Sequence, residues 1–411
     1  MKSRCPLRHV FRGFGVMPLS LCVLGLSWQH PVLAEGAVPL ETVKGLHPYA
    51  TVAVAYDSNL LRRPHAELVI LRDLYGGESD IYATLEAGFA TAIDYSRQQV
   101  VIGGRVYHVS YDRFNQLDHT GGDARILWNW VRGSLWEGDL GYTFVRKQRD
   151  FANEVIPTND MLDRNRAYAT AKRWITTRWR LGGQAEVVAT SFDKSEDLNR
   201  TLLGVGAMLD YVSAAGSVIG INAVYSDGQY WNQPDRDYTQ ASIGPSGEWS
   251  PTLKTHVKGN IAYETFKHDE RPERDFDGLV GRVKATWRVT GKTSVATTLS
   301  RAYSNLEDES ANFAIVDSLS FEPAWNITSK TTLRALASFQ RQDYQSLQSA
   351  NIASELDARV DDIISLGLWV DWQLRSNVSV SLGYAAGSRE STHELKEYDF
   401  QNVQAIFTIG L

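Results

Sequence analysis

The stretch LVGRVKATWRV, residues 279–289, decides the fold class. Its odd-numbered positions are mostly apolar, whereas the even-numbered positions from Arg282 to Arg288 carry charge or a hydroxyl. A period of two places these two sets on opposite faces of a β-strand, and a helix would scatter both sets around its circumference. Residues 378–384 and 178–187 alternate in the same way. The sequence therefore predicts an all-β protein.

Breaks between the alternating segments differ in length in a regular order. Short breaks fall near residues 95–97, 132–134, 176–177, 213–216, 250–252, 290–292, 328–330 and 375–377. Longer polar breaks fall near residues 58–77, 114–119, 151–161, 194–198, 229–236, 268–275, 306–312, 346–358 and 391–396. Eight short turns and nine long loops join about 18 strands, an even number, which is typical of an outer-membrane barrel. We therefore predict a transmembrane antiparallel up-and-down β-barrel without a plug domain.

Aromatic residues are sorted along the predicted strands. Ten of the 12 tryptophans lie within about six residues of a short turn, namely Trp128, Trp130, Trp136, Trp174, Trp179, Trp249, Trp287, Trp325, Trp369 and Trp372. Tyrosines lie toward the opposite strand ends, namely Tyr56, Tyr107, Tyr111, Tyr225, Tyr263, Tyr303 and Tyr344. Amphipathic rings prefer the two interfaces of a bilayer, so this sorting predicts two aromatic girdles.

The first 34 of the 411 residues have the pattern of a secretory signal peptide. Four basic residues precede a mostly apolar run over residues 16–28, and Val32-Leu33-Ala34 offers small residues for cleavage after Ala34. We expect residues 35–46 to be a short periplasmic segment and residues 47–411 to form the barrel. A mean hydropathy of −0.28 excludes a protein built of many apolar membrane helices.

The positions of the cysteines and the net charge disfavour some classes of function. Cys5 and Cys22 are the only cysteines, and both lie in the expected signal peptide. Removal of that segment takes four basic and no acidic residues, so the net charge falls from −6 to −10. A negative exported chain without disulfides is a poor candidate for binding nucleic acid, and its stability must come from a large regular structure.

The polar faces of the strands supply the candidate functional residues. In a transmembrane barrel the apolar face meets lipid and the polar face lines the lumen. The expected pore-lining residues are Glu137, Asp139, Arg178, Arg180, Glu186, Lys258, Glu264, Arg282, Lys284 and Arg288, with Lys147, Arg149, Arg334 and Asp371 on the same faces. Arg301 falls on the apolar face of its strand, and alternation does not explain it. Catalytic, metal-binding and cofactor-binding patterns are not found, so an enzyme is disfavoured.

A short motif leaves the first predicted strand. Tyr56-Asp57-Ser58-Asn59-Leu60-Leu61-Arg62 resembles the exit from strand one in the EpsL-like β-barrel porins of exopolysaccharide gene clusters. The resemblance implies export of a polysaccharide chain across the outer membrane with a periplasmic polysaccharide export protein. Outer-membrane lipid and the outer-membrane insertion machinery are the other expected partners. The final residues alternate up to Leu411, as in the signal that this machinery reads, although Phe is usual at the last position.

Two transport functions stay open at this point. An export channel fits the resemblance, the wide polar lumen and the absence of a plug. A diffusion porin for sugars or small polar solutes is the alternative, although the third outer loop near residues 151–161 is short for the usual inward constriction. A purely structural or adhesive barrel is a further possibility.

Overall fold

The computed structural model describes residues 45–64, 76–149, 151, 158–304, 313–345 and 359–411. The expected signal peptide lies outside these residues. Within them the chain forms 18 strands. The strands are β1 (His47–Asp57), β2 (Asp80–Tyr95), β3 (Gln98–Tyr111), β4 (His119–Arg132), β5 (Trp136–Gln148), β6 (Met161–Trp174), β7 (Trp179–Phe192), β8 (Arg200–Val212), β9 (Val218–Tyr230), β10 (Tyr238–Thr252), β11 (Thr255–His268), β12 (Phe276–Arg288), β13 (Thr293–Ser304), β14 (Phe313–Asn326), β15 (Thr331–Gln345), β16 (Val360–Arg375), β17 (Val378–Ser391) and β18 (Tyr398–Gly410).

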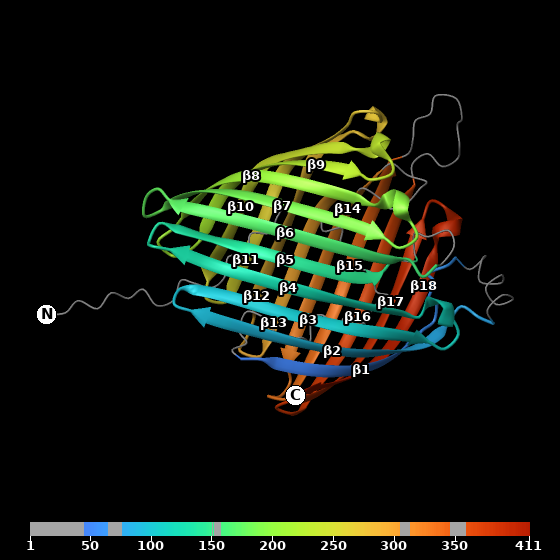
Figure 1. Ribbon diagram of the computed structural model, residues 1–411. Coiled ribbons are helices and arrows are strands. Elements are labelled where there is room, and N and C mark those ends of the chain that lie inside the picture. The colour runs from blue at the N-terminus through green and yellow to red at the C-terminus, as the bar shows by residue number, and fades with distance from the viewer. Residues whose placement is uncertain (1–44, 65–75, 150, 152–157, 305–312, 346–358) are drawn as a thin grey trace.

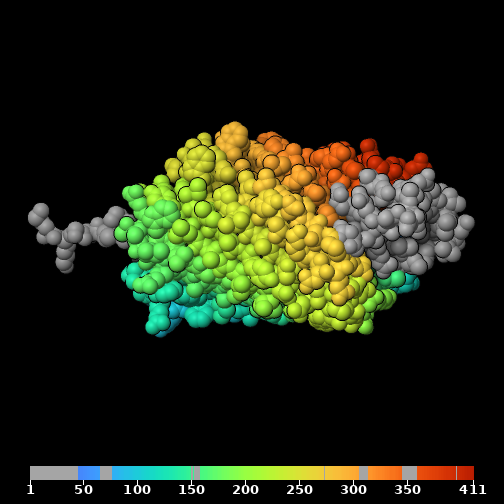
Figure 2. Space-filling model, turned by 90° about the horizontal axis from the view of Figure 1, so that it is seen from above, coloured from blue at the N-terminus to red at the C-terminus, as the bar shows by residue number. Residues whose placement is uncertain are grey.

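Each strand pairs antiparallel with its neighbours in the chain, and β1 also pairs with β18. The pairing of β1 with β18 runs from Tyr49 opposite Gly410 to Asp57 opposite Asn402. The sheet is therefore closed. Figure 1 shows its tilted strands side by side around the barrel, and Figure 2 shows the outer surface that they form on one side. Closure satisfies the backbone groups of every strand within the sheet, as a bilayer requires. The predicted 18-stranded up-and-down barrel is confirmed.

Short turns and long loops lie at opposite ends of the barrel (Figure 1). All eight predicted short turns are present, and Gly133 and Gly216 adopt the positive φ values of 61° and 83° that such tight turns need. The end with the longer loops is here called the outer mouth. Its described residues include the short 3₁₀ turns η2 (Asn115–Leu117), η4 (Glu196–Leu198), η5 (Pro234–Arg236), η6 (Pro272–Arg274) and η7 (Glu394–Lys396). Among the described residues no helix is long and apolar enough to cross a membrane.

The outward face of the wall is apolar. On β12, for example, Leu279 and Trp287 are 61% and 51% exposed, and their strand neighbours of the opposite parity face the interior. Exposed side chains of this kind continue around the barrel, where lipid would cover them. Arg301 also faces outward, near the outer end of β13, and its guanidinium lies 3.3 Å from the Asp317 carboxylate on β14. An ion pair at the edge of the apolar belt accounts for this charge.

The predicted aromatic girdles are correct only in part. Seven tryptophans are exposed on the outward face: Trp128, Trp136, Trp179, Trp249, Trp287, Trp325 and Trp372. Trp174 and Trp369 instead contact the lumen-facing residues Arg180 and Arg334. Of the tyrosines, Tyr107, Tyr111, Tyr303 and Tyr344 are buried, whereas Tyr56, Tyr225 and Tyr263 are exposed. The prediction used distance along the strand and ignored which face each ring occupies.

Candidate functional site in the barrel lumen

The interior wall is polar, and its charges are organised by strand register. A pocket of about 320 Å³ on the inner wall brings together residues from β6 to β12. Its charged side chains come from two separated groups of strands. These are Lys172, Arg180 and Asp210 on β6 to β8, and Glu248, Lys258, Arg282 and Lys284 on β10 to β12, with His256 beside the second group.

The first group is an internally neutralised network. Nζ of Lys172 lies 3.0 Å from Oδ2 of Asp210, and Nε of Arg180 lies 2.9 Å from the same oxygen. Nη1 of Arg180 also donates to Oε1 of Glu137 at 2.6 Å. Two acids thus balance two bases. Because the guanidinium on β7 bonds to acids on β5 and β8, it links the wall across the four strands from β5 to β8.

The second group carries excess positive charge. Lys258 on β11 is directly opposite Lys284 on β12, and Asn260 is opposite Arg282. The acid nearest to them is Glu248, whose Oε2 lies 4.0 Å from Nζ of Lys258. Among the described residues Arg282 and Lys284 form no ion pair, and Nε of Arg282 has no hydrogen-bond partner. This segment of the wall should therefore attract anions.

The other expected pore-lining residues lie outside these two groups. Oδ2 of Asp139 accepts from the Thr170 hydroxyl at 3.1 Å, and Oε2 of Glu186 accepts from Nε of Arg166 at 3.0 Å. Oε2 of Glu264 accepts from Nε2 of Gln240 at 2.9 Å. Arg288 is the last residue of β12, at the short-turn end.

Arg178 has a different position from the one expected. It lies in the turn before β7, and its Nη1 donates to the Tyr211 hydroxyl at 3.2 Å. The side chain is exposed at the rim of the barrel, because the strand begins only at Trp179.

Sequence reasoning missed the inward packing of the first outer loop. Leu60 and Leu61 are 2% and 1% exposed and pack with Tyr82, Tyr107 and Tyr111, among other residues. These tyrosines point into the barrel from β2 and β3. The beginning of the first loop therefore lies against the inner wall at the outer mouth. Two consecutive leucines in a polar loop were the available signal.

A buried ion pair holds this segment in place. Asp57 accepts from Arg62 through both oxygens, at 2.7 and 2.9 Å, and from the backbone N–H of Asn59 at 3.0 Å. The Arg62 guanidinium also lies 3.9 Å from the centre of the Phe400 ring. Burial opposes the charge of Arg62, but the Asp57 carboxylate outweighs it and raises the pKa of Arg62 above its ordinary value. The motif at residues 56–62 is thus a local folding device.

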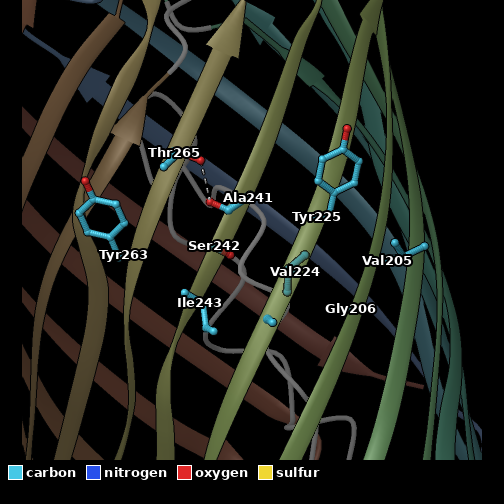
Figure 3. Close-up of a pocket in the computed structure, with 10 residues that line it drawn as sticks. Val205, Gly206, Val224, Tyr225, Ala241, Ser242, Ile243, Tyr263 and Thr265 are labelled. Carbon is cyan, nitrogen blue, oxygen red and sulfur yellow. Dashed lines mark hydrogen bonds between the residues drawn. The ribbon is translucent and has the colours of Figure 1, made fainter.

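The outward face has a broad hollow of about 510 Å³ between β8 and β11. In Figure 3 the rings of Tyr225 and Tyr263 flank the small side chain of Ala241, whose carbonyl accepts from the Thr265 hydroxyl at 3.5 Å. The lining is largely apolar. This hollow belongs to the lipid-facing surface and not to the transport path.

Comparisons with known proteins are limited to solved structures. No family model and no curated protein matches the chain. OccK1 (OpdK) of Pseudomonas aeruginosa is 11% identical, with 89% of this chain and 98% of that chain covered and a TM-score of 0.47. OccK2 (OpdF) of the same organism, in complex with glucuronate, is 9% identical with coverage of 89% and 98% and a TM-score of 0.49. A BenF-like porin from Pseudomonas fluorescens Pf-5 is 10% identical, with coverage of 90% and 100% and a TM-score of 0.47.

The closed wall and its apolar outer face fix the location. This chain is a bacterial outer-membrane β-barrel. The resemblance to EpsL-like barrels is wrong, because the matching solved structures are Occ-type and BenF-like porins and no family model matches. The motif from Tyr56 to Arg62 misled because its residues bond to one another and stabilise a turn. A motif with this local role carries no information about the transported substrate.

Proposed function

We propose that this protein is a diffusion porin for small polar solutes. The observation that carries the proposal is the inner wall itself. Its charges are mostly neutralised in pairs, and a cationic segment around β12 has Arg282 and Lys284, which form no ion pair among the described residues. Paired charges hold water without binding a solute tightly, and the cationic segment attracts solutes that carry negative charge.

The inward position of the first loop also favours small solutes. Leu60, Leu61 and Arg62 occupy space along the inner wall at the outer mouth. A segment held there by a buried ion pair reduces the cross-section available to a passing molecule. Size-limited diffusion follows naturally from such a fixed obstacle, whereas a bulky polymer would have to displace it.

Export of a polysaccharide, which the sequence had favoured, is not proposed. Without the resemblance to EpsL-like barrels, nothing supports a polysaccharide chain or a periplasmic export protein as a partner. Outer-membrane lipid is retained as the surrounding medium. The absence of enzymatic activity stays a prediction, since it rested on missing sequence patterns.

Reconstitution tests the proposal directly. Purified folded protein in liposomes should admit monosaccharides, amino acids and small organic acids, and it should exclude oligosaccharides above a size limit. Heat-unfolded protein at the same lipid ratio is the control. In cells, deletion should slow uptake of small solutes and leave surface polysaccharide unchanged. Lost polysaccharide with normal uptake, or liposomes that admit no solute, would refute the proposal.

A further inference from the structure

The eight short turns of the barrel carry charge of one sign. Between the strand ends they contain no acidic residue and five basic residues, namely Arg97, Arg178, Lys254, Lys292 and Lys330. All five basic side chains are exposed. In each outer loop that contains one of the 3₁₀ turns, by contrast, acidic residues outnumber basic residues. The positive charge is therefore a property of the short-turn end and not of the surface as a whole.

Three of these turns have the same construction. Residues 252–255 read TLKT, residues 290–293 read TGKT and residues 328–331 read TSKT, in the hairpins β10–β11, β12–β13 and β14–β15. In each turn the hydroxyl oxygen of the first threonine accepts the backbone N–H of the lysine at 3.1 Å. The lysine carbonyl accepts a backbone N–H from the following strand, and the donors are Arg288, Asn326 and Gln373, at 2.7, 2.8 and 2.8 Å.

The side chains of the three lysines take no part in this construction. Both turn bonds engage only the lysine backbone, so any residue with a backbone N–H would serve. Within the described part of the chain, Lys254, Lys292 and Lys330 form no ion pair. The structure of the turn therefore does not explain why lysine occurs three times at this position.

Each lysine lies next to a tryptophan of the outward face. The threonine that follows each lysine is directly opposite a tryptophan of the next strand, and these tryptophans are Trp287, Trp325 and Trp372. Their rings are 51%, 47% and 52% exposed. Exposed tryptophan near the end of a membrane-spanning strand marks the headgroup level of the bilayer. The lysines, one residue closer to the turn, are therefore at the level of the lipid headgroups.

The chemistry of this leaflet matches the lysines. The short turns of outer-membrane barrels face the periplasm, where the leaflet consists of phospholipids. A lysine ammonium is a compact charge with three donors, and a phosphate oxygen accepts such donors. Neighbouring hairpins place the lysines roughly 10 Å apart, because two strand spacings separate them. Three separate headgroups can therefore be bound next to one another.

We propose that the turns at Lys254, Lys292 and Lys330 form a docking surface for anionic phospholipids of the periplasmic leaflet. Each ammonium contacts the phosphate of one headgroup, and the neighbouring tryptophan packs on the same lipid. A zwitterionic lipid also has a phosphate, but its own cationic group repels the lysine, so the surface selects lipids by net charge. The position beside lipid-facing rings favours a lipid over a periplasmic protein or polymer. This role does not depend on the solute that the barrel transports.

Tryptophan fluorescence can report which lipid lies beside these turns. The folded protein is placed in vesicles in which either phosphatidylglycerol or phosphatidylcholine carries bromine on its acyl chains, and quenching gives the relative binding constants of the two lipids. A parent variant, W128F/W136F/W179F, retains as outward reporters Trp249, Trp287, Trp325 and Trp372. In this parent, K254Q/K292Q/K330Q removes the charges and keeps the N–H groups of the turns. The matched control K194Q/K267Q/K396Q removes three lysines at the outer mouth.

The parent should prefer phosphatidylglycerol by roughly fivefold, the effect of one cation close to an anionic lipid. K254Q/K292Q/K330Q should lose most of this preference, whereas K254R/K292R/K330R and the outer-mouth control should keep it. All variants should remain heat-modifiable on gels. Equal binding of the two lipids by the parent, an unchanged preference in the glutamine variant, or an equal loss in the outer-mouth control overturns the proposal.

A second arm distinguishes the cell wall from the lipid. Retention of the parent on isolated peptidoglycan that the glutamine variant loses, without any lipid preference, would assign the lysines to the cell wall and overturn the proposal. Fluorescence quenching needs no open pore, so failure of the porin function would be seen separately.

Discussion

Substitution of Asp57 by alanine should release the first outer loop from the inner wall. The pair of Asp57 and Arg62 is almost fully buried, with side-chain exposures of 2% and 4%. Alanine removes both acceptors and leaves a buried guanidinium without its carboxylate. Removal of one partner from a buried ion pair costs about 3–5 kcal/mol. Arg62 also holds a left-handed backbone conformation, φ 55°, which the ion pair helps to maintain.

The free-energy cost of D57A should appear as local opening of the first outer loop, because the substitution leaves the hydrogen bonds between the flanking strands unchanged. A loss of 3–5 kcal/mol raises the population of the detached loop by roughly 10²- to 5 × 10³-fold. Trypsin cleavage after Arg62 follows that population when opening is fast compared with cleavage. We expect D57A to be cleaved there at least about a hundredfold faster than wild type, while the barrel stays heat-modifiable.

Asp371→Ala is the matched control for this experiment. Arg334 and Asp371 also form a bidentate pair on the inner wall, but their side chains are 28% and 30% exposed. Water can replace the lost partner there, so the cost is at most about 1 kcal/mol. D371A should leave cleavage after Arg62 unchanged. Cleavage of D57A at the wild-type rate would show that the ion pair does not hold the loop.

Three further predictions concern the wall and the mouth. Trp287→Asp should lower folding yield more than Lys284→Asp, because a charge on the lipid face costs up to roughly 2–4 kcal/mol and less near the interface; equal yields would refute the assignment of faces. The double reversal K258E/K284E should shift reversal potentials toward cation preference, whereas an unchanged potential would place the ion path away from β11 and β12. Burial raises the pKa of Asp275. The ammonium of Lys267 and the N–H of His268 outweigh burial and lower this pKa below the ordinary 3.8. Its stabilising contribution is therefore complete above pH 3.8 and is lost as pH falls through the lowered value, so hydrogen exchange at His268 should accelerate only in that acidic range.

The wall was predictable from the sequence because each strand has an apolar face and a polar face. That rule placed Lys258, Arg282 and Lys284 on the inner wall, and loop lengths fixed the strand count. It could not pair Arg180 with Asp210 and Glu137, since the register between strands depends on where each turn begins. It also failed where the strands stop: Arg178 lies in a turn, and Leu60 and Leu61 fold inward by contacts that no periodic pattern records.

Closure of the wall has a consequence for assembly. Every interface joins strands adjacent in the chain except the seam between β1 and β18, where Thr51 meets Thr408 through their hydroxyls at 3.0 Å. The sheet can therefore lengthen hairpin by hairpin from contacts that are close in sequence, which is kinetically easy. The seam must wait for the last hairpin, and until then two long edges expose unpaired backbone groups. The growing sheet is thus most vulnerable just before it is complete, and protection is needed at those two edges alone.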